Sequence, residues 1–210
     1  MIMDEKFKLI LSKTEQLFKS YGIRSLSMDD ISRNLGISKK TLYQYVNSKD
    51  ELVEKVFQNE QDEMNMFMEE NITPDMNAID VLLKASTKVS ANLKNYNPIV
   101  IFDLQKYYPE LYNRHLQNHV SMLQDKIFFN IEQGKNEGLY RSEVNAKLVA
   151  HLYITNLIEI HRSEIVMTNN FSFKDIFQIM FENHIRAISS RKGVEYFEQE
   201  VQSLYNFENQ

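Results

Sequence analysis

Three serines at helix-capping positions, with a glycine between the first two, constrain the fold of this chain more than any other feature. In residues 26–53, LSMDDISRNLGISKKTLYQYVNSKDELV, Ser27 can begin a helix that Gly36 ends after about two turns. Ser38 can begin a second short helix, and Ser48 a third and longer one. Helices of two turns are unstable in isolation, so both short helices must pack on a neighbour.

The preceding segment supplies that neighbour. Its apolar side chains recur at steps of three and four, which places them on one face of a helix over about residues 4–21, with Gly22 just beyond its end. The residues on this face are Phe7, Ile10, Leu11, Thr14, Leu17, Phe18 and Tyr21. A first helix followed by two short helices around a glycine turn predicts a helix-turn-helix unit.

The rest of the chain is predicted to form long helices with brief interruptions. Only five glycines and three prolines occur in 210 residues, and no alternating apolar and polar run is long enough to indicate a strand. We therefore predict an all-α fold of about nine or ten helices. Residues 1–48 are expected to form a three-helix helix-turn-helix domain, and residues 49–210 a larger helical domain for ligand binding and dimerisation.

Charge is distributed unevenly between these parts. The net charge is −5, yet residues 1–50 carry nine Lys or Arg against six Asp or Glu. The basic N-terminal region can approach phosphate, whereas the acidic remainder of the chain is repelled from it.

Cysteine and long apolar runs are both lacking in the sequence. Without cysteine the chain has no thiol nucleophile, disulfide or cysteine-ligated zinc. No stretch approaches the roughly 18 apolar residues of a membrane span, and residues 1–18 do not resemble a signal peptide. We expect a cytoplasmic protein with no membrane partner.

The second short helix presents chemistry suited to DNA. Leu42 and Val46 fall on one side of it, and Lys40 and Gln44 point away from them. Ammonium, amide and hydroxyl groups bond to base edges and phosphates. The candidate DNA-binding residues on and beside the exposed face are Lys39, Lys40, Thr41, Tyr43 and Gln44.

Lys49 stands in the first turn of the following helix, where a cation opposes the helix dipole. A phosphate docked there would explain it, because the free amides of the helix start and the ammonium would share one anion.

The stretch SLSMDDISRNLGISKKTLYQYVNSKDELV resembles the DNA-binding domain of the TetR family of bacterial repressors. In that family the pattern T-L-Y-x-[HY]-[FV]-x-x-K-[ED]-x-L closes the recognition helix and opens the fourth helix, and the resemblance covers about residues 7–57. It implies a homodimer on a double-stranded, palindromic DNA operator, acting most often as a repressor that a small-molecule effector releases.

The same resemblance implies roles for single residues. The base contacts would come from Thr41, Lys39 and Lys40, and the phosphate contacts from Tyr43, Tyr45, Lys49 and Ser27. Two features depart from the common pattern: Tyr45 stands where the family often has histidine, and Asp29 puts an acid near the DNA side.

Aromatic residues are concentrated in the larger domain, with 17 of the 24 in residues 96–210. Aromatic walls with a few polar groups are typical of a small-molecule cavity, and equally of an ordinary core. The candidate effector-binding residues are Phe102, Tyr107, Phe128 and Tyr153, and the effector itself is not identified by the sequence.

Two late segments, 148–160 and 171–181, are apolar nearly all round. A helix of this kind must be covered on both sides, and a second subunit would supply the extra cover. In the resembled family the last two main helices form a four-helix dimer interface.

An enzyme, or an adaptor for another protein, is the alternative interpretation. His115 and His119 lie four residues apart, a spacing that can hold a metal, but no HExxH pattern, GxSxG elbow or glycine-rich phosphate loop accompanies them. We therefore expect no metal, no cofactor and no enzymatic activity. The alternative would be a helical small-molecule- or metal-binding enzyme, or an adaptor, with a DNA-binding-like head.

Overall fold

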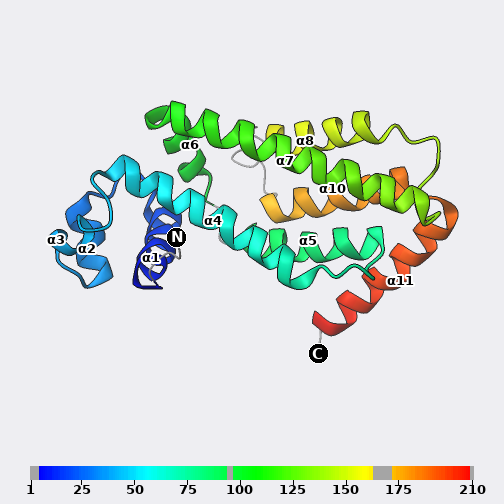
Figure 1. Ribbon diagram of the computed structural model, residues 1–210, viewed down its shortest axis with the longest axis horizontal. Helices are drawn as coiled ribbons and strands as arrows, with labels where there is room; N and C mark the ends of the chain where they lie inside the picture. The colour runs from blue at the N-terminus through cyan, green and yellow to red at the C-terminus, as the bar shows by residue number, and fades with distance from the viewer. Residues whose placement is uncertain (1–4, 94–96, 163–171, 209–210) are drawn as a thin grey trace. The chain divides into compact units, whose positions relative to one another are not determined.

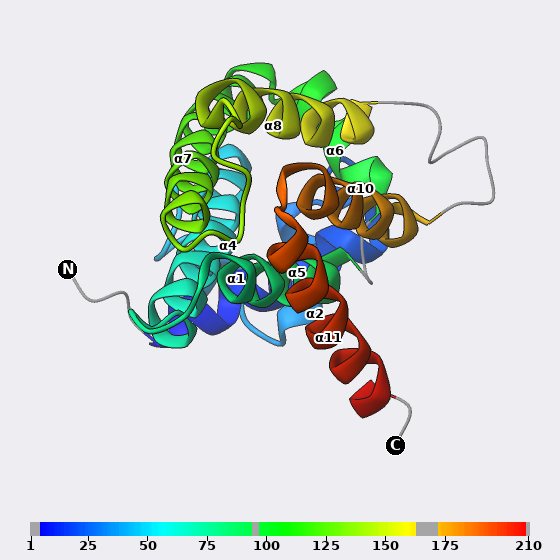
Figure 2. The same ribbon diagram turned by 90° about the vertical axis from the view of Figure 1, so that its right-hand side faces the viewer.

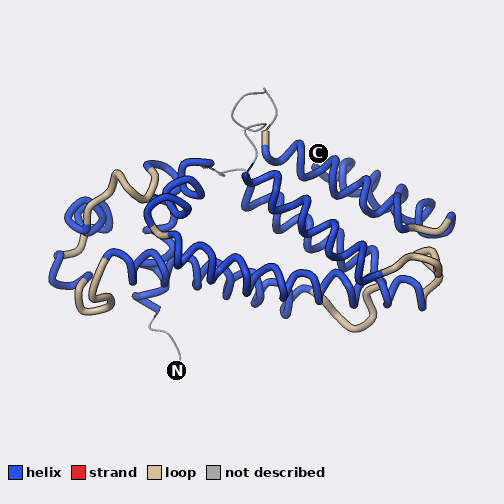
Figure 3. The backbone as a smooth tube through the Cα atoms, turned by 90° about the horizontal axis from the view of Figure 1, so that it is seen from above, coloured by secondary structure: helices blue, strands red, loops and turns tan. Residues whose placement is uncertain are grey.

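The computed structural model describes residues 5–93, 97–162 and 172–208, with its helices labelled in Figure 1. These residues form ten α-helices and no strand (Figure 3), so the predicted all-α fold of about nine or ten helices is confirmed. The helices are α1 Glu5–Tyr21, α2 Met28–Leu35, α3 Lys39–Leu42, α4 Lys49–Asn71, α5 Ala78–Leu93, α6 Pro98–Tyr107, α7 Pro109–Asn136, α8 Ala146–Arg162, α10 Phe173–Ile188 and α11 Arg191–Glu208.

By packing, the chain divides into two compact units. The head unit is Met1–Glu70 with Asn95–Gln117, and the body unit is Asn71–Lys94 with Asn118–Gln210. This division differs from the boundary expected at residues 48 and 49, because most of α4 and all of α6 pack with the helix-turn-helix. The functional boundary itself stays a prediction.

The capping residues act as the sequence predicted. The Ser27 side chain accepts a hydrogen bond from the N–H of Asp30, and the Asp30 carboxylate accepts one from the N–H of Ser27, forming a capping box. Gly36 ends α2 in the left-handed conformation with φ 68°, and Ser38 caps α3 through the N–H of Thr41.

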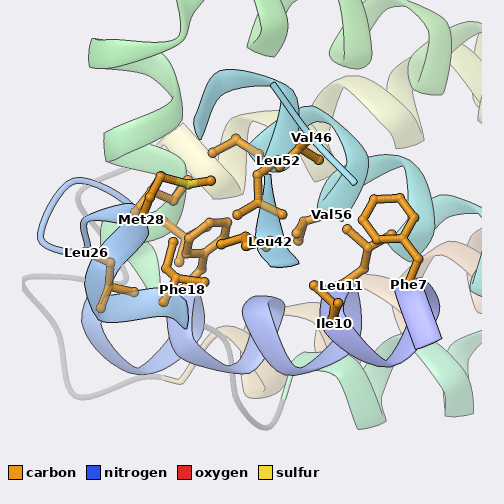
Figure 4. Close-up of a cluster of buried hydrophobic side chains, with 14 of the residues drawn as sticks. Phe7, Ile10, Leu11, Phe18, Leu26, Met28, Leu42, Val46, Leu52 and Val56 are labelled. Atoms are coloured by element: carbon orange, nitrogen blue, oxygen red, sulfur yellow. The ribbon is translucent and has the colours of Figure 1, made fainter. Parts of the chain in front are cut away.

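A single apolar cluster holds the head unit together (Figure 4). Leu42 and Val46 are completely buried in it, as their spacing predicted. The cluster also takes side chains from α4 and α6, including Val56 and Leu104. The short helices are therefore stabilised by three longer ones, α1, α4 and α6.

The body unit is a helical bundle in which α10 lies beside α5, with α8 and the second part of α7 around them (Figure 2). Its buried apolar residues include Ile79, Ile131, Ile154 and Phe181, one from each of these four helices. A polar group joins two of these helices as well: Asn130 in α7 donates to the carbonyl of Ala78, the first residue of α5, at 2.8 Å.

Candidate nucleic-acid interface

The recognition segment is shorter as a helix than its sequence indicates. Helix α3 has only four residues, Lys39–Leu42, where we expected about two turns. Beyond it the backbone tightens, because the N–H groups of Gln44 and Tyr45 bond to carbonyls three residues back, Thr41 and Leu42. Val46 still reaches the core, so the expected inner and outer faces are retained.

The outer face carries the polar groups that the sequence predicted. Lys40 and Gln44 are exposed, and Tyr43 is 42% exposed. Thr41 is half-buried, and its hydroxyl lies 2.8 Å from that of Ser38. Lys40, Gln44 and Tyr43 are thus available to a partner in the described head, whereas Thr41 is engaged locally.

Lys39 is held by an ion pair. Its Nζ lies 2.9 Å from Oδ2 of Asp29 in the first turn of α2, and both side chains are about half exposed. The hydrogen bond and charge of Asp29 raise the pKa of Lys39. Asp29 therefore pairs with Lys39, one of the predicted base-contacting residues, and balances its positive charge in the free protein.

The predicted phosphate contacts occupy three different settings. Ser27 is exposed and caps α2. Tyr45 is half-buried, with its ring stacked on Phe7 at a centroid distance of 4.9 Å. Lys49 donates from Nζ to the Ile23 carbonyl at 2.7 Å, and burial followed by the charge of Arg24 lowers its pKa.

Helix α6 and its capping residue form hydrogen bonds to the segment before α2, and these bonds were not predicted from the sequence. The carboxylate of Asp103, itself buried, accepts a hydrogen bond from the N–H of Arg24. Asn97, which caps α6, donates from Nδ2 to the Lys19 carbonyl at 2.9 Å. The guanidinium of Arg24 lies over the ring of Tyr107. An aspartate within the apolar run PIVIFDL, residues 98–104, was the available signal in the sequence.

The four candidate effector residues do not fall in one unit. Phe102 and Tyr107 belong to the head unit and are exposed, and the ammonium of Lys106 lies 5.2 Å from the Phe102 ring centroid. Phe128 and Tyr153 belong to the body unit and are half-buried.

The described residues contain neither a candidate metal site nor a candidate membrane span. No three His, Asp or Glu side chains there are grouped closely enough to hold a metal ion. His115 is half-buried, and burial lowers its pKa. None of the described helices is long and apolar enough to cross a membrane.

Comparison with known proteins gives the same picture of the head. Residues 10–56 match the family described as bacterial regulatory proteins, tetR family. The chain is 25% identical over 185 residues to an uncharacterized HTH-type transcriptional regulator, YvaF, of Bacillus subtilis strain 168, covering 87% of this chain and 95% of that protein.

Solved structures extend the likeness to the whole fold. A transcriptional regulator from Cytophaga hutchinsonii shares 18% identity with a TM-score of 0.68, covering 89% of this chain and 100% of that one. The fatty acid degradation regulator FadR from Bacillus halodurans shares 16% identity with a TM-score of 0.65, covering 88% and 97%. At these identities the likeness shows the fold alone.

Proposed function

Because residues 10–56 match the tetR family of bacterial regulatory proteins, we propose that this chain is a DNA-binding transcriptional regulator of that family and acts as a repressor. In this proposal a homodimer binds a palindromic operator, and a small-molecule effector releases it. The observation that carries the proposal is the outer face of the recognition segment, where Lys40, Tyr43 and Gln44 are exposed beside the buried Leu42.

The side chains of that face can form hydrogen bonds to base edges in a DNA groove. Lys40 can donate to guanine O6 and N7, and the Gln44 amide can pair with adenine N6 and N7. The Tyr43 hydroxyl can donate to a phosphate oxygen, and Ser27 can do so if its O–H turns away from the Asp30 carboxylate to which it donates. Lys49 uses one N–H on the Ile23 carbonyl, so its ammonium retains two further donors for a phosphate.

Two apolar helix faces support the homodimer. On α8, Ala150 and Ile154 are buried, whereas Leu148 and Leu152 are 54% and 52% exposed. On α10, Phe177 and Phe181 are buried, whereas Ile179 is 64% exposed. Thus α8 keeps two leucines and α10 one isoleucine uncovered within the described chain, and a second copy offering the same two helices would cover them isologously.

The body unit is the proposed effector site, with Tyr153 and Phe128 retained as candidates. Helix α7 begins in the head unit and continues into the body unit, so a change in the body can reach the head through one helix. An effector need only bind the arrangement incompatible with DNA more tightly than the other.

Selection of bound duplexes from a random DNA pool tests the proposal. The expected product is an inverted repeat bound by two chains, with half-sites about one helical turn apart. Affinity for that duplex should fall steeply with salt, because phosphate contacts release counterions. Enrichment of no common sequence, or binding that is insensitive to salt, would contradict the proposal.

A further inference from the structure

A histidine in the body unit has a buried ring nitrogen without a hydrogen-bond partner. His184 lies in α10, and among the described residues no group bonds to its Nε2 atom. The ring meets Tyr153 of α8 at a centroid distance of 4.1 Å and an interplanar angle of 34°. The two side chains therefore bring α8 and α10 together at a polar point inside an apolar bundle.

The surroundings of His184 on its own helix are apolar. Phe177 lies seven residues before His184, Phe181 lies three residues before it, and Ile188 lies four residues after it. All three are on the same face of the helix and are buried. The rings of Phe177 and Phe181 stack with centroids 6.0 Å apart. His184 thus continues a row of aromatic side chains that points into the body unit.

Both polar groups at this point are neutral near pH 7. Burial lowers the pKa of His184 to about 4, so its imidazole carries no charge there. Burial also raises the pKa of the Tyr153 phenol, which stays protonated. Neither group offers a positive charge to a bound molecule.

A buried ring nitrogen without a partner is costly, and native structures seldom keep one unless a water or a ligand completes it. Neutral imidazole can accept or donate one hydrogen bond at Nε2, depending on its tautomer. A hydroxyl or a carbonyl group satisfies one tautomer or the other. An ionised carboxylate would be buried beside neutral groups without a compensating cation.

We propose that Nε2 of His184, beside the Tyr153 ring, is the polar end of the effector site, and that the effector is a neutral, mainly apolar molecule with a hydroxyl or carbonyl group. This inference rests on the proposed function, and it specifies the chemistry of the effector. The aromatic row of Phe177 and Phe181 would contact the apolar part of that molecule.

Three probes of equal chain length test the inference on the full-length protein: 1-decanol, 2-decanone and decanoate at pH 7.5. Binding is followed by the ring ¹⁵N resonances of His184 and by the thermal unfolding midpoint. We expect the alcohol and the ketone to shift the Nε2 resonance and raise the midpoint, and decanoate to bind at least about ten-fold more weakly.

Variants separate a ligand contact from a structural role. H184F removes the nitrogen and keeps an aromatic ring, so it should bind 1-decanol about ten-fold more weakly. It should also leave the unliganded protein at least as stable, because an unsatisfied buried atom is gone. H184Q, which keeps a neutral N–H at similar reach, should retain binding. H151F, at an exposed histidine of α8, is the matched control and should bind like the wild type.

Several results would overturn the inference: tighter binding of decanoate than of 1-decanol, unchanged 1-decanol binding in H184F, or no binding of any probe by the wild type. Operator binding of the wild type is measured in parallel. If the protein binds its operator but ignores the probes, the effector assignment fails and the proposed DNA-binding function stands. If it binds no operator, the proposed function itself fails.

Discussion

The carboxylate of Asp103 in α6 accepts a 2.7 Å hydrogen bond from the backbone N–H of Arg24, 79 residues earlier in the chain. Gly22, at φ 80°, lies against the same carboxylate: a Cβ there would be 3.1 Å from Oδ2. The turn that leads into the helix-turn-helix is therefore shaped around a side chain of α6.

Replacing Asp103 tests this anchor. D103A removes the acceptor and leaves the Arg24 N–H unpaired beneath α6, so the free energy of unfolding should fall by about 1–3 kcal/mol. Chemical denaturation measures the change. D103N keeps a carbonyl oxygen in place and serves as the control; equal stability of D103A and the wild type would show that the bond contributes nothing.

The recognition face is tested by single truncations. K40A and Y43A should each weaken operator binding by about 1–3 kcal/mol, since each removes one contact to base or phosphate. Fluorescence anisotropy with the selected duplex measures the loss, and sedimentation checks that assembly is unchanged. Unaltered affinity in both variants would show that another surface reads DNA.

Asp29 restrains Lys39, so D29N should free that ammonium for phosphate. Affinity should rise for every duplex, specific or not, and the salt dependence should steepen by about one counterion. Titrations at several salt concentrations give the slope. E143Q makes the same charge change at an exposed acid of the body unit, outside the predicted DNA interface, and should leave both quantities near the wild-type values. A D29N variant that binds DNA more weakly would instead make the Asp29 to Lys39 pair part of the contact.

Leu152 is the test of self-association. L152E places a glutamate on the exposed apolar face of α8, and in an isologous dimer two such charges would be buried without partners, at a cost of about 3–5 kcal/mol. Light scattering should then find a monomer at concentrations where the wild type is a dimer. The matched control is L9E, at an equally exposed leucine of α1, which should remain dimeric.

His184 predicts how stability depends on pH. Its folded pKa of about 4 lies below the unfolded value of 6.5, so the unfolded chain binds more protons between these values. Stability is therefore highest above pH 6.5 and falls as the pH drops towards 4. Between pH 7 and pH 5 the wild type should lose up to about 2 kcal/mol relative to H184F. Parallel curves for the two proteins would contradict this assignment.

Local chemistry explains what the sequence could predict. The cap formed by Ser27 and Asp30 involves neighbours three residues apart, so both partners are visible in the sequence. The spacing of Leu42 and Val46 likewise needed only the helix period. The helix order, the cap positions and the exposed recognition face all follow from such short-range patterns.

The sequence could not predict contacts between residues that lie far apart in the chain. The helix period marks an inward face but does not name its partner, so Asp103 could not be matched to Arg24, nor His184 to Tyr153. The phosphate contact of the Tyr45 hydroxyl stays a prediction, whereas the stacking of its ring on Phe7 involves a residue of α1 that the local pattern does not indicate. The aromatic character of Phe102 and Tyr107 makes them candidate effector contacts but does not indicate in which unit they lie.

The head unit is assembled from two stretches of chain, Met1–Glu70 and Asn95–Gln117, with α5 between them in the sequence. A fragment cut after residue 48 or 70 would lose Val100, Asp103 and Leu104 together, exposing apolar surface and freeing the turn at Arg24. A chimera that joins this DNA-binding unit to a different sensor domain must therefore also include α6, which comes from a separate stretch of the sequence.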